Sequence, residues 1–339
     1  MPNERNSTLD LAVVIVSWNV RDLVLQAIRS VRDDLRASGL SSEIWVIDNA
    51  STDDTVEAIQ AQFSDVRVIA SAENLGFVRG NNRVLRQIGF KLPDTPLPLN
   101  AAVTQARIGD AKIALPNAVY LLNPDTITTS GATRALYEAL MHDPKVGLVG
   151  ARLTYEDGSF QHSAFMFPGL RQLWTEFFPT PGRLIENRFN GRYPRAFYEG
   201  VQPFPVDFVL GATMMLKREV IERTGAFDHE FFMYCEEIDW AWRIRNTGYS
   251  VMCVPSAHSV HLAGKSTAQM RPQAMVYLWQ SRLCLYDKHY PTWKARLARW
   301  MIIQGMRRKI AQTDDAALRD AYRQIEQLAI KNYQHKDTN

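Results

Sequence analysis

A short apolar segment that ends in Asn123-Pro124-Asp125 places the strongest constraint on how this chain folds. Residues 119–122 before it are apolar and rich in β-formers, which is typical of a buried strand. Proline cannot continue a central strand, because it has no N–H to donate to the ladder. We therefore expect Asp125 just beyond the carboxyl end of a buried strand, where open α/β sheets bind their ligands. The alternative is a turn aspartate that only happens to follow a strand.

The N-terminal part alternates strand and helix patterns. Residues 11–16 are continuously apolar, as in a parallel strand buried on both faces, and residues 21–35 carry apolar side chains at helical spacing. Two further strands are predicted at 43–47 and 66–69. This alternation predicts the α/β class, with a doubly wound, mostly parallel central sheet flanked by helices.

The composition is that of a globular protein and excludes several classes of function. Of the 339 residues, 46% are hydrophobic and 22% are charged, which suits one large domain or two moderate ones. The net charge of +3 is too small to indicate a nucleic-acid partner, and three cysteines without CxxC spacing indicate neither a disulfide framework nor a zinc site. Residues 1–10 are polar and the apolar run after them is too short for export or a membrane span, so we expect a cytoplasmic protein.

Polar residues at the predicted strand ends are the first candidates for a binding site. Asp48 can accept a hydrogen bond from the imide N–H of uracil or thymine or from a ribose hydroxyl, and an Asx-turn or N-cap role is the alternative. Gly76 permits a positive φ or a close backbone approach to a ligand. Asn81 and Asn82 offer donors near the start of a helix predicted at 83–90, where anions are favoured. The first strand is not followed by G-x-G-x-x-G, which argues against a dinucleotide site.

Three carboxylates crowd the start of another predicted helix, namely Glu236, Glu237 and Asp239. Crowded carboxylates raise one another's pKa, which suits a general base, and the helix dipole offsets part of their repulsion. A solvated acidic first turn is the alternative. Arg243 follows Asp239 by one helical turn and is placed to pair with it.

Other segments of the C-terminal half have less regular patterns. His261 follows a strand predicted at 251–255 and precedes a glycine-containing loop, and Asp207 lies in a further strand pair that could face a ligand. Residues 155–205 are rich in aromatic residues and proline, and they form either a binding loop or lid or irregular packing over the sheet. Residues 91–118 are predicted to be an inserted surface loop or small hairpin.

Four segments, in order along the chain, resemble glycosyltransferase family 2. They are Val16-Ser17-Trp18-Asn19, Asp48-Asn49-Ala50-Ser51-x-Asp53, Asn74-x-Gly76-Phe77-x-x-Gly80-Asn81-Asn82 and Leu122-Asn123-Pro124-Asp125. The resemblance runs from about residue 10 to 265 and is closest to the rhamnosyltransferase-like branch. It implies a GT-A fold, a nucleoside-diphosphate sugar donor and a divalent cation, Mg²⁺ or Mn²⁺.

The resemblance also implies a role for each donor-side residue. Asp48 would read the nucleobase, and the nucleotide-sugar-binding residues as a group would be Ser17, Asn19, Asp48, Asn74, Gly76, Asn81, Asn123 and Lys265. Asp125 takes the last position of the family's metal-binding D-x-D, whose first position here is Asn123. His261 matches the histidine that reaches the metal or the diphosphate.

On the acceptor side, the resemblance assigns the chemistry to the acidic helix start. Glu237 matches the catalytic base, which is an Asp in the family, and Glu236 and Asp239 match the acidic positions on either side of it. Either of these two could instead act as the base or orient the loop.

The chain beyond the resemblance is basic and helical, with helices predicted at 275–290, 292–310 and 313–331. We predict a GT-A domain over 1–268, with a nucleotide-sugar half (8–130) and an acceptor half (131–268), followed by a basic amphipathic extension (269–339). Residues 275–310 either lie on an anionic membrane surface or pack on the core or a second subunit. The expected lipid-linked acceptor favours the membrane.

The sequence therefore predicts an inverting, metal-dependent hexosyltransferase of cell-surface polysaccharide synthesis. The best candidate donor, on resemblance alone, is dTDP-rhamnose, and the acceptor is a glycan or a lipid-linked glycan. We expect the protein in the cytoplasm, peripheral at the inner face of the cell membrane, with homo-oligomerisation left open. The alternative is a non-catalytic sugar-nucleotide-binding subunit of a polysaccharide assembly complex, because Asn123 and Glu237 each replace an Asp of the family.

Overall fold

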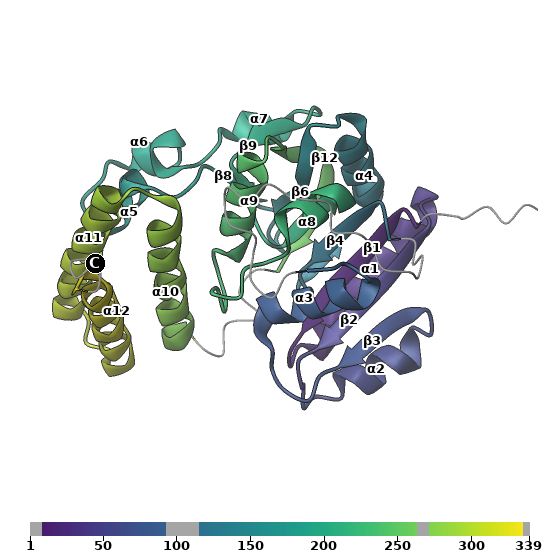
Figure 1. Cartoon of the computed structure of the whole chain (residues 1–339), viewed down its shortest axis with the longest axis horizontal. Coiled ribbons are helices and arrows are strands. Elements are labelled where there is room, and N and C mark those ends of the chain that lie inside the picture. Colours follow the sequence, from purple (N-terminus) through teal and green to yellow (C-terminus); the bar gives the residue numbers. More distant parts are fainter. Residues whose placement is uncertain (1–8, 93–114, 263–270, 335–339) are drawn as a thin grey trace, which may run out of the picture.

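A computed structural model describes residues 9–92, 115–262 and 271–334 (Figure 1). Within these ranges the main body is a ten-stranded sheet with helices on both faces, and three C-terminal helices stand beside it. The strand order is β3-β2-β1-β4-β11-β6-β12-β5, with β7 paired to β6 and β9 paired to β12.

Strand β1 (Leu11–Ser17) is the centre of the N-terminal half and is buried at every position. It pairs in parallel with β2 (Ser42–Asp48) on one side and with β4 (Ala118–Leu122) on the other. Successive side chains point to opposite faces, so odd-numbered residues join the apolar cluster of α1 and even-numbered residues join that of α3. The prediction of a parallel strand buried on both faces is confirmed.

The helices form a layer on each face of the sheet. One layer contains α1 (Arg21–Ser38), α2 (Thr55–Gln62) and α4 (Ala132–His142), and the other contains α3 (Gly76–Ile88), α8 (Arg218–Thr224) and α9 (Glu236–Asn246). The predicted α/β class, with a central sheet flanked by helices, is confirmed. Strands β3-β2-β1-β4 are all parallel, whereas β11 runs antiparallel to both of its neighbours.

The remaining strands belong mostly to the C-terminal half. The main sheet includes β3 (Val66–Ala70), β5 (Thr126–Thr128), β6 (Val146–Thr154), β7 (Phe160–Gln161), β9 (Phe204–Val206), β11 (Thr213–Lys217) and β12 (Ser250–His261). A separate pair is formed by β8 (Ala164–Phe165) and β10 (Phe208–Val209).

The start of the helix predicted at 83–90 is wrong. Helix α3 begins at Gly76, where the side chain of Asn74 accepts a hydrogen bond from the Gly76 N–H at 2.9 Å. Asn81 and Asn82 therefore lie inside the helix rather than near its start, and both are buried.

The end of the strand predicted at 251–255 is also wrong. Strand β12 continues to His261, because a bulge between Val254 and His258 accommodates Pro255 without ending the pairing with β6. His261 thus lies at the end of a long strand rather than in a loop.

The three predicted C-terminal helices are confirmed as α10 (Arg271–His289), α11 (Thr292–Gln312) and α12 (Ala316–Gln334). They surround a third apolar cluster that also receives side chains from α5 (Leu170–Phe177). The segment predicted as a lid or irregular packing, residues 155–205, also contains β7, β8, the start of β9 and three short helices, α6 (Gly182–Ile185), η1 (Arg188–Asn190) and α7 (Arg195–Glu199). The domain boundary predicted at 268 and most of the predicted insertion at 91–118 lie outside the described residues, so both stay predictions.

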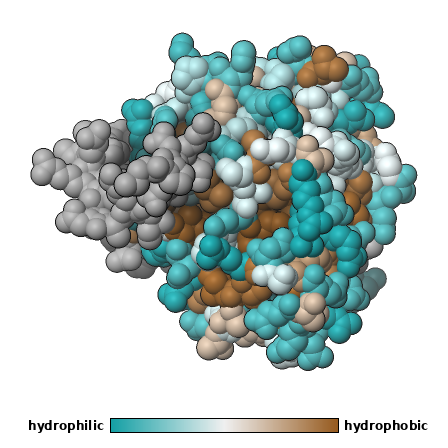
Figure 2. Space-filling model, turned by 90° about the vertical axis from the view of Figure 1, so that its right-hand side faces the viewer, coloured by the Kyte–Doolittle hydropathy of each residue, from teal (hydrophilic) through white to brown (hydrophobic). Residues whose placement is uncertain are grey.

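The face in Figure 2 is the side of the molecule on which β1 and α1 lie in Figure 1. Hydrophilic residues occupy its periphery, and hydrophobic residues gather near its centre beside the undescribed segments. None of the helices in the described ranges combines the length and the hydropathy needed to span a bilayer.

Candidate active site

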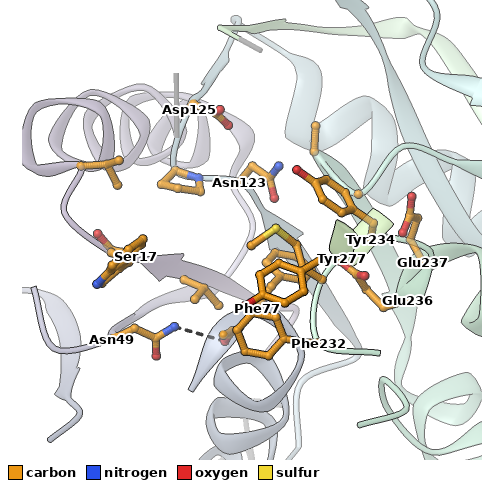
Figure 3. A pocket seen from close by; sticks show the side chains of 18 of the residues that line it. Ser17, Asn49, Phe77, Asn123, Asp125, Phe232, Tyr234, Glu236, Glu237 and Tyr277 are labelled. Atoms are coloured by element: carbon orange, nitrogen blue, oxygen red, sulfur yellow. Dashed lines mark hydrogen bonds between the residues drawn. The ribbon is translucent and has the colours of Figure 1, made fainter. Parts of the chain in front are cut away.

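A cavity of about 350 Å³ opens at the carboxyl ends of β1 and β4 (Figure 3). Ser17, Asn123 and Asp125 line one side of it, and Glu236 and Glu237 line the side formed by the start of α9. This is the place at which open α/β sheets bind ligands, and it brings together residues from both halves of the chain.

Asp125 and His261 meet at one end of the cavity. The backbone carbonyl of Asp125 accepts a hydrogen bond from the Leu262 N–H at 2.9 Å, which ties the end of β12 beside it. The Nε2 atom of His261 lies 3.4 Å from Oδ1 of Asp125. The two residues predicted as metal ligands are therefore adjacent, although 136 positions separate them in the sequence (261 minus 125).

The other ring nitrogen of His261 is held by Gln161 of β7. Its Nδ1 atom lies 3.1 Å from the amide nitrogen and 3.3 Å from the amide oxygen of Gln161, and both side chains are buried. The amide of Gln161 thus holds the imidazole ring by Nδ1 and leaves Nε2 on the side of Asp125.

These side chains fit a divalent cation. The carboxylate of Asp125 and the amide of Asn123 are oxygen donors of the kind that Mg²⁺ and Mn²⁺ prefer, and the imidazole of His261 adds a nitrogen donor. The described residues contain no cluster of three or more His, Cys, Asp or Glu side chains that would hold a metal ion by itself. A cation in this corner would therefore take further ligands from a bound substrate.

The wall beside this corner is formed by polar residues at the ends of β1, β2 and β3. Ser17 is fully buried. Ser17, Asn74 and Gly76 all line the cavity. The side chain of Asn49 donates a hydrogen bond to the Gly76 carbonyl at 3.1 Å, which holds the start of α3 against β2. Gly76 has φ +71°, and a Cβ there would lie 3.0 Å from the ring of Phe232, so this position requires glycine.

Two predicted donor-side residues bind a neighbouring loop and do not line the cavity. The carboxylate of Asp48 accepts hydrogen bonds from the N–H and the hydroxyl of Ser51, at 2.8 and 2.6 Å. The amide oxygen of Asn19 accepts from the Thr52 N–H at 2.8 Å. The Asx-turn alternative thus describes the contacts of Asp48 in this structure, and its role in reading a nucleobase stays a prediction.

Other predicted candidates also lie away from the cavity. Asn81 donates to the Phe77 carbonyl one turn earlier in α3, at 2.9 Å, so the expectation of a donor at the helix start is wrong. Asp207 does not face a ligand site, because its carboxylate accepts from the Phe167 N–H at 2.8 Å and binds Arg245. Lys265 lies outside the described residues.

Glu236 and Glu237 are presented to the cavity by a strained turn. Tyr234 and Cys235, directly before α9, have φ values of +68° and +65°. These lie in the left-handed backbone region that residues other than glycine rarely adopt. Burial raises the pKa of Glu237 to about 7. Burial and the charge of Glu237 together raise the pKa of Glu236 well above its ordinary value.

Asp239, on the same helix, is fully buried away from the cavity. It binds Arg243 at 2.8 Å, which confirms the predicted pair, and it also accepts from His289 at 2.8 Å and from Lys288 at 3.0 Å. Burial alone would raise the pKa of Asp239, but the hydrogen bond from His289 and the two cations hold it far below the ordinary value. Of the two predicted roles for Asp239, this geometry favours orientation of the loop over proton transfer.

The cavity also has lining residues that sequence reasoning missed. Phe232 and Tyr234 come from the segment before α9, and Tyr277 comes from α10, with the rings of Phe232 and Tyr277 5.0 Å apart. Gln161 lies in a strand of two residues, too short to give a periodic signal. Asn49 was within the quoted Asp48-Asn49-Ala50-Ser51 segment, so that motif could have identified it.

The raised pKa of Glu237 predicts a pH-dependent cost to stability. A carboxyl group whose folded-state pKa is raised contributes stability below its ordinary pKa of 4.5, and this contribution is lost as the pH rises to about 7. We expect Glu237→Gln to raise the melting temperature by a few degrees at about pH 8, and by little at about pH 4. Thermal unfolding at both pH values checks this, with Glu199→Gln on exposed α7 as the control. Equal melting temperatures for wild type and Glu237→Gln at the higher pH would show that the carboxyl is not held in a desolvated site.

Comparison with known proteins agrees with this fold. Residues 12–89 match the model of the family described as Glycosyl transferase family 2. Over 265 residues the chain is 27% identical to an N-acetylglucosaminyl-diphospho-decaprenol L-rhamnosyltransferase of Mycobacterium tuberculosis, and the match covers 76% of this chain and 79% of the relative.

Solved glycosyltransferases share the fold. The structure of GalNAc-T7 with UDP, GalNAc and Mn²⁺ matches with a TM-score of 0.55 and 14% identity, covering 98% of this chain and 58% of that one. The mannosyltransferase PcManGT from Pyrobaculum calidifontis, in complex with GDP-Man and Mn²⁺, matches with a TM-score of 0.51 and 16% identity, covering 96% of this chain and 87% of that one. The predicted GT-A fold is confirmed. The family match and the rhamnosyltransferase relative confirm the predicted resemblance of this chain to glycosyltransferase family 2 and to its rhamnosyltransferase-like branch.

Proposed function

We propose that this chain is an inverting glycosyltransferase that moves a sugar from a nucleoside diphosphate to a hydroxyl group of a glycan acceptor. One observation carries the proposal. Glu237, with its raised pKa, faces the corner of Asp125 and His261 across a single cavity (Figure 3). One in-line displacement requires a base on one side of the anomeric carbon and a site for the leaving diphosphate on the other side.

We assign the diphosphate of the donor to the corner of Asp125, His261 and Asn123. A divalent cation held there would neutralise the charge that develops on the departing nucleoside diphosphate. The chain itself positions the ligands, because Pro124 ends β4 before Asp125 and Gln161 orients the imidazole of His261. Ser17, Asn74 and Gly76 line the adjoining wall and are assigned to the nucleotide-sugar.

Glu237 is assigned as the general base. The acceptor hydroxyl gives its proton to the Glu237 carboxylate while its oxygen attacks the anomeric carbon. The bond from that carbon to the diphosphate oxygen breaks, and its electron pair leaves with the nucleoside diphosphate. A single displacement of this kind inverts the anomeric configuration.

Glu236 assists by remaining protonated. Its carboxyl is buried and lies next to Glu237, so a second negative charge there is strongly disfavoured. When one proton leaves this coupled pair near neutral pH, Glu237 is the carboxyl that ionises, because it lines the cavity and is less deeply buried.

The substrates are proposed by similarity to the relative. The Mycobacterium tuberculosis protein is named for transfer of L-rhamnose to N-acetylglucosaminyl-diphospho-decaprenol. We propose dTDP-rhamnose as the donor and a lipid-linked glycan as the acceptor, in polysaccharide synthesis. The aromatic rings of Phe232, Tyr234 and Tyr277 in the cavity wall suit the apolar faces of sugar rings.

A lipid-linked acceptor would bring the enzyme to a membrane surface, and α11 is the proposed contact. Trp293, Leu297 and Trp300 follow one another at helical spacing on one face, and they are 65%, 40% and 52% exposed. Arg296 and Arg308 are exposed on the same helix. Exposed tryptophans beside arginines are typical of helices that lie in the interface of an anionic bilayer.

The catalytic assignment predicts that Glu237→Gln lowers kcat for sugar transfer by about 10²- to 10⁴-fold, the usual contribution of a general base. Donor binding with Mn²⁺, measured by calorimetry, should stay within a few-fold of wild type, because glutamine has the same shape. Glu199→Gln is the control for loss of a carboxylate elsewhere. Full activity of Glu237→Gln would contradict the assignment. A wild-type chain that binds the donor but transfers to no acceptor would instead support a non-catalytic subunit.

The membrane assignment predicts that Trp293→Ser with Trp300→Ser weakens binding to vesicles of phosphatidylcholine and phosphatidylglycerol by about tenfold or more, because two apolar interfacial anchors are lost. Sedimentation with vesicles measures this. Tyr155→Ser removes an exposed aromatic from the turn after β6 and should have no effect. Wild-type protein that fails to sediment would contradict the membrane role, and a dimer that dissociates in the double variant would point to a subunit contact.

A further inference from the structure

One face of α10 packs along residues 228–239. Tyr277, Ser281, Cys284 and Lys288 are spaced by four, three and four residues, so they lie in one row on the helix. Each of them contacts a residue between Asp228 and Asp239, the segment that contains Glu236 and Glu237.

The first three residues of the row contact the middle of the segment, between Glu230 and Met233. The ring of Tyr277 lies 5.0 Å from that of Phe232, and the hydroxyl of Ser281 donates to the Met233 carbonyl at 2.8 Å. The sulfur of Cys284 lies 3.8 Å from a carboxylate oxygen of Glu230.

Lys288 joins the two ends of the segment. Its ammonium group binds the carboxylate of Asp228 and lies 3.0 Å from that of Asp239, and both carboxylates are buried. The ammonium is thus the shared cation of two buried anions, one at the start of the turn and one on α9. His289, the next residue, donates to the same Asp239 oxygen at 2.8 Å.

The backbone of residues 228–239 needs contacts that hold it in place, and we call the contacts from α10 the clamp. Two consecutive residues, Tyr234 and Cys235, adopt left-handed backbone angles immediately before Glu236. Such a turn persists only where surrounding contacts hold it, and it relaxes where they are removed. The contacts of α10 supply this restraint from outside the sheet.

We propose that α10 is a positioning element of the active site and that Lys288 is its principal positioning residue. By joining Asp228 to Asp239, Lys288 holds the turn in the geometry that aims Glu237 into the cavity. The C-terminal helices are then part of the catalytic unit rather than a separable appendage. The catalytic consequence rests on the proposed function, whereas the clamp itself does not.

The same helix offers a matched control. Arg282 also carries a positive charge in α10, but its partner is Glu176 of α5, and its guanidinium lies over the ring of Trp279. Arg282→Met removes a cation and an ion pair from α10 but no hydrogen bond or ion pair to residues 228–239. The guanidinium also acts electrostatically on Cys235, but burial raises the pKa of that thiol well above its ordinary value, so the thiol is uncharged and little is lost there. Arg282→Met therefore separates loss of the clamp from a general loss of stability.

Hydrogen exchange on the unliganded full-length chain tests the clamp. In Lys288→Met we expect amides of residues 229–237 to exchange about tenfold faster or more, while those of β1 keep their protection. Arg282→Met should leave the exchange of 229–237 unchanged. Lys288→Arg, which keeps the cation, should restore most of the protection. Should Lys288→Met fail to fold, Ser281→Ala, which loses one hydrogen bond to the turn, replaces it in the same comparison.

The catalytic consequence is measured separately. Lys288→Met should lower kcat about tenfold or more while the KM for the donor changes less than about threefold, because the base is displaced and the donor wall is not. Unchanged exchange at 229–237, or equal acceleration in Arg282→Met, would overturn the clamp. Faster exchange of residues 229–237 in Lys288→Met, together with a wild-type kcat, would contradict the proposed effect of Lys288 on catalysis. A wild-type chain without transferase turnover would refute the proposed function and leave the exchange result to decide the clamp.

Discussion

The parallel register of β1 against β2 and β4 determines where the cavity can form. Ser17 aligns with Asp48 and Ile15 aligns with Leu122, so the three strands reach the same edge of the sheet together. Pro124 then stops β4, and Asp125 leaves the sheet near the level of Ser17. A slip of one residue would turn every β1 side chain to the opposite face, so the two apolar clusters enforce the register and with it the geometry of the site.

The acceptor side depends on a different kind of interaction, a buried network of charges. Asp239 is satisfied by Arg243, Lys288 and His289, and removal of one partner would leave an uncompensated charge in the interior. Such networks add little net stability, but they admit few alternative arrangements. The network lies directly behind Glu236 and Glu237, which are themselves held partly protonated by burial. The chain thus places an ionised carboxylate, Asp239, near two carboxyl groups whose pKa burial raises, Glu237 to about 7 and Glu236 well above its ordinary value.

Much of this arrangement could be predicted from local patterns. Continuous apolar runs predict β1 and β4, one ordered motif contains Asp125, and the family resemblance implies that His261 and Glu237 share its site. Local patterns failed where tertiary contacts decide. The bulge that carries β12 past Pro255 and the burial of Asn81 depend on neighbours that the sequence does not place. Tyr277 and Lys288 lie on a helix after the last motif, and only folding brings them to the cavity and the turn.

The central claim is that Glu237 and the corner of Asp125 and His261 carry out one inverting displacement. Its most direct test is incubation of the purified chain with dTDP-rhamnose, Mn²⁺ and a lipid-diphosphate N-acetylglucosamine acceptor, followed by NMR of the product. The account predicts a new rhamnosyl linkage whose anomeric configuration is opposite to that of the donor. A product with the donor's configuration would contradict it, because a single in-line displacement inverts the anomeric carbon.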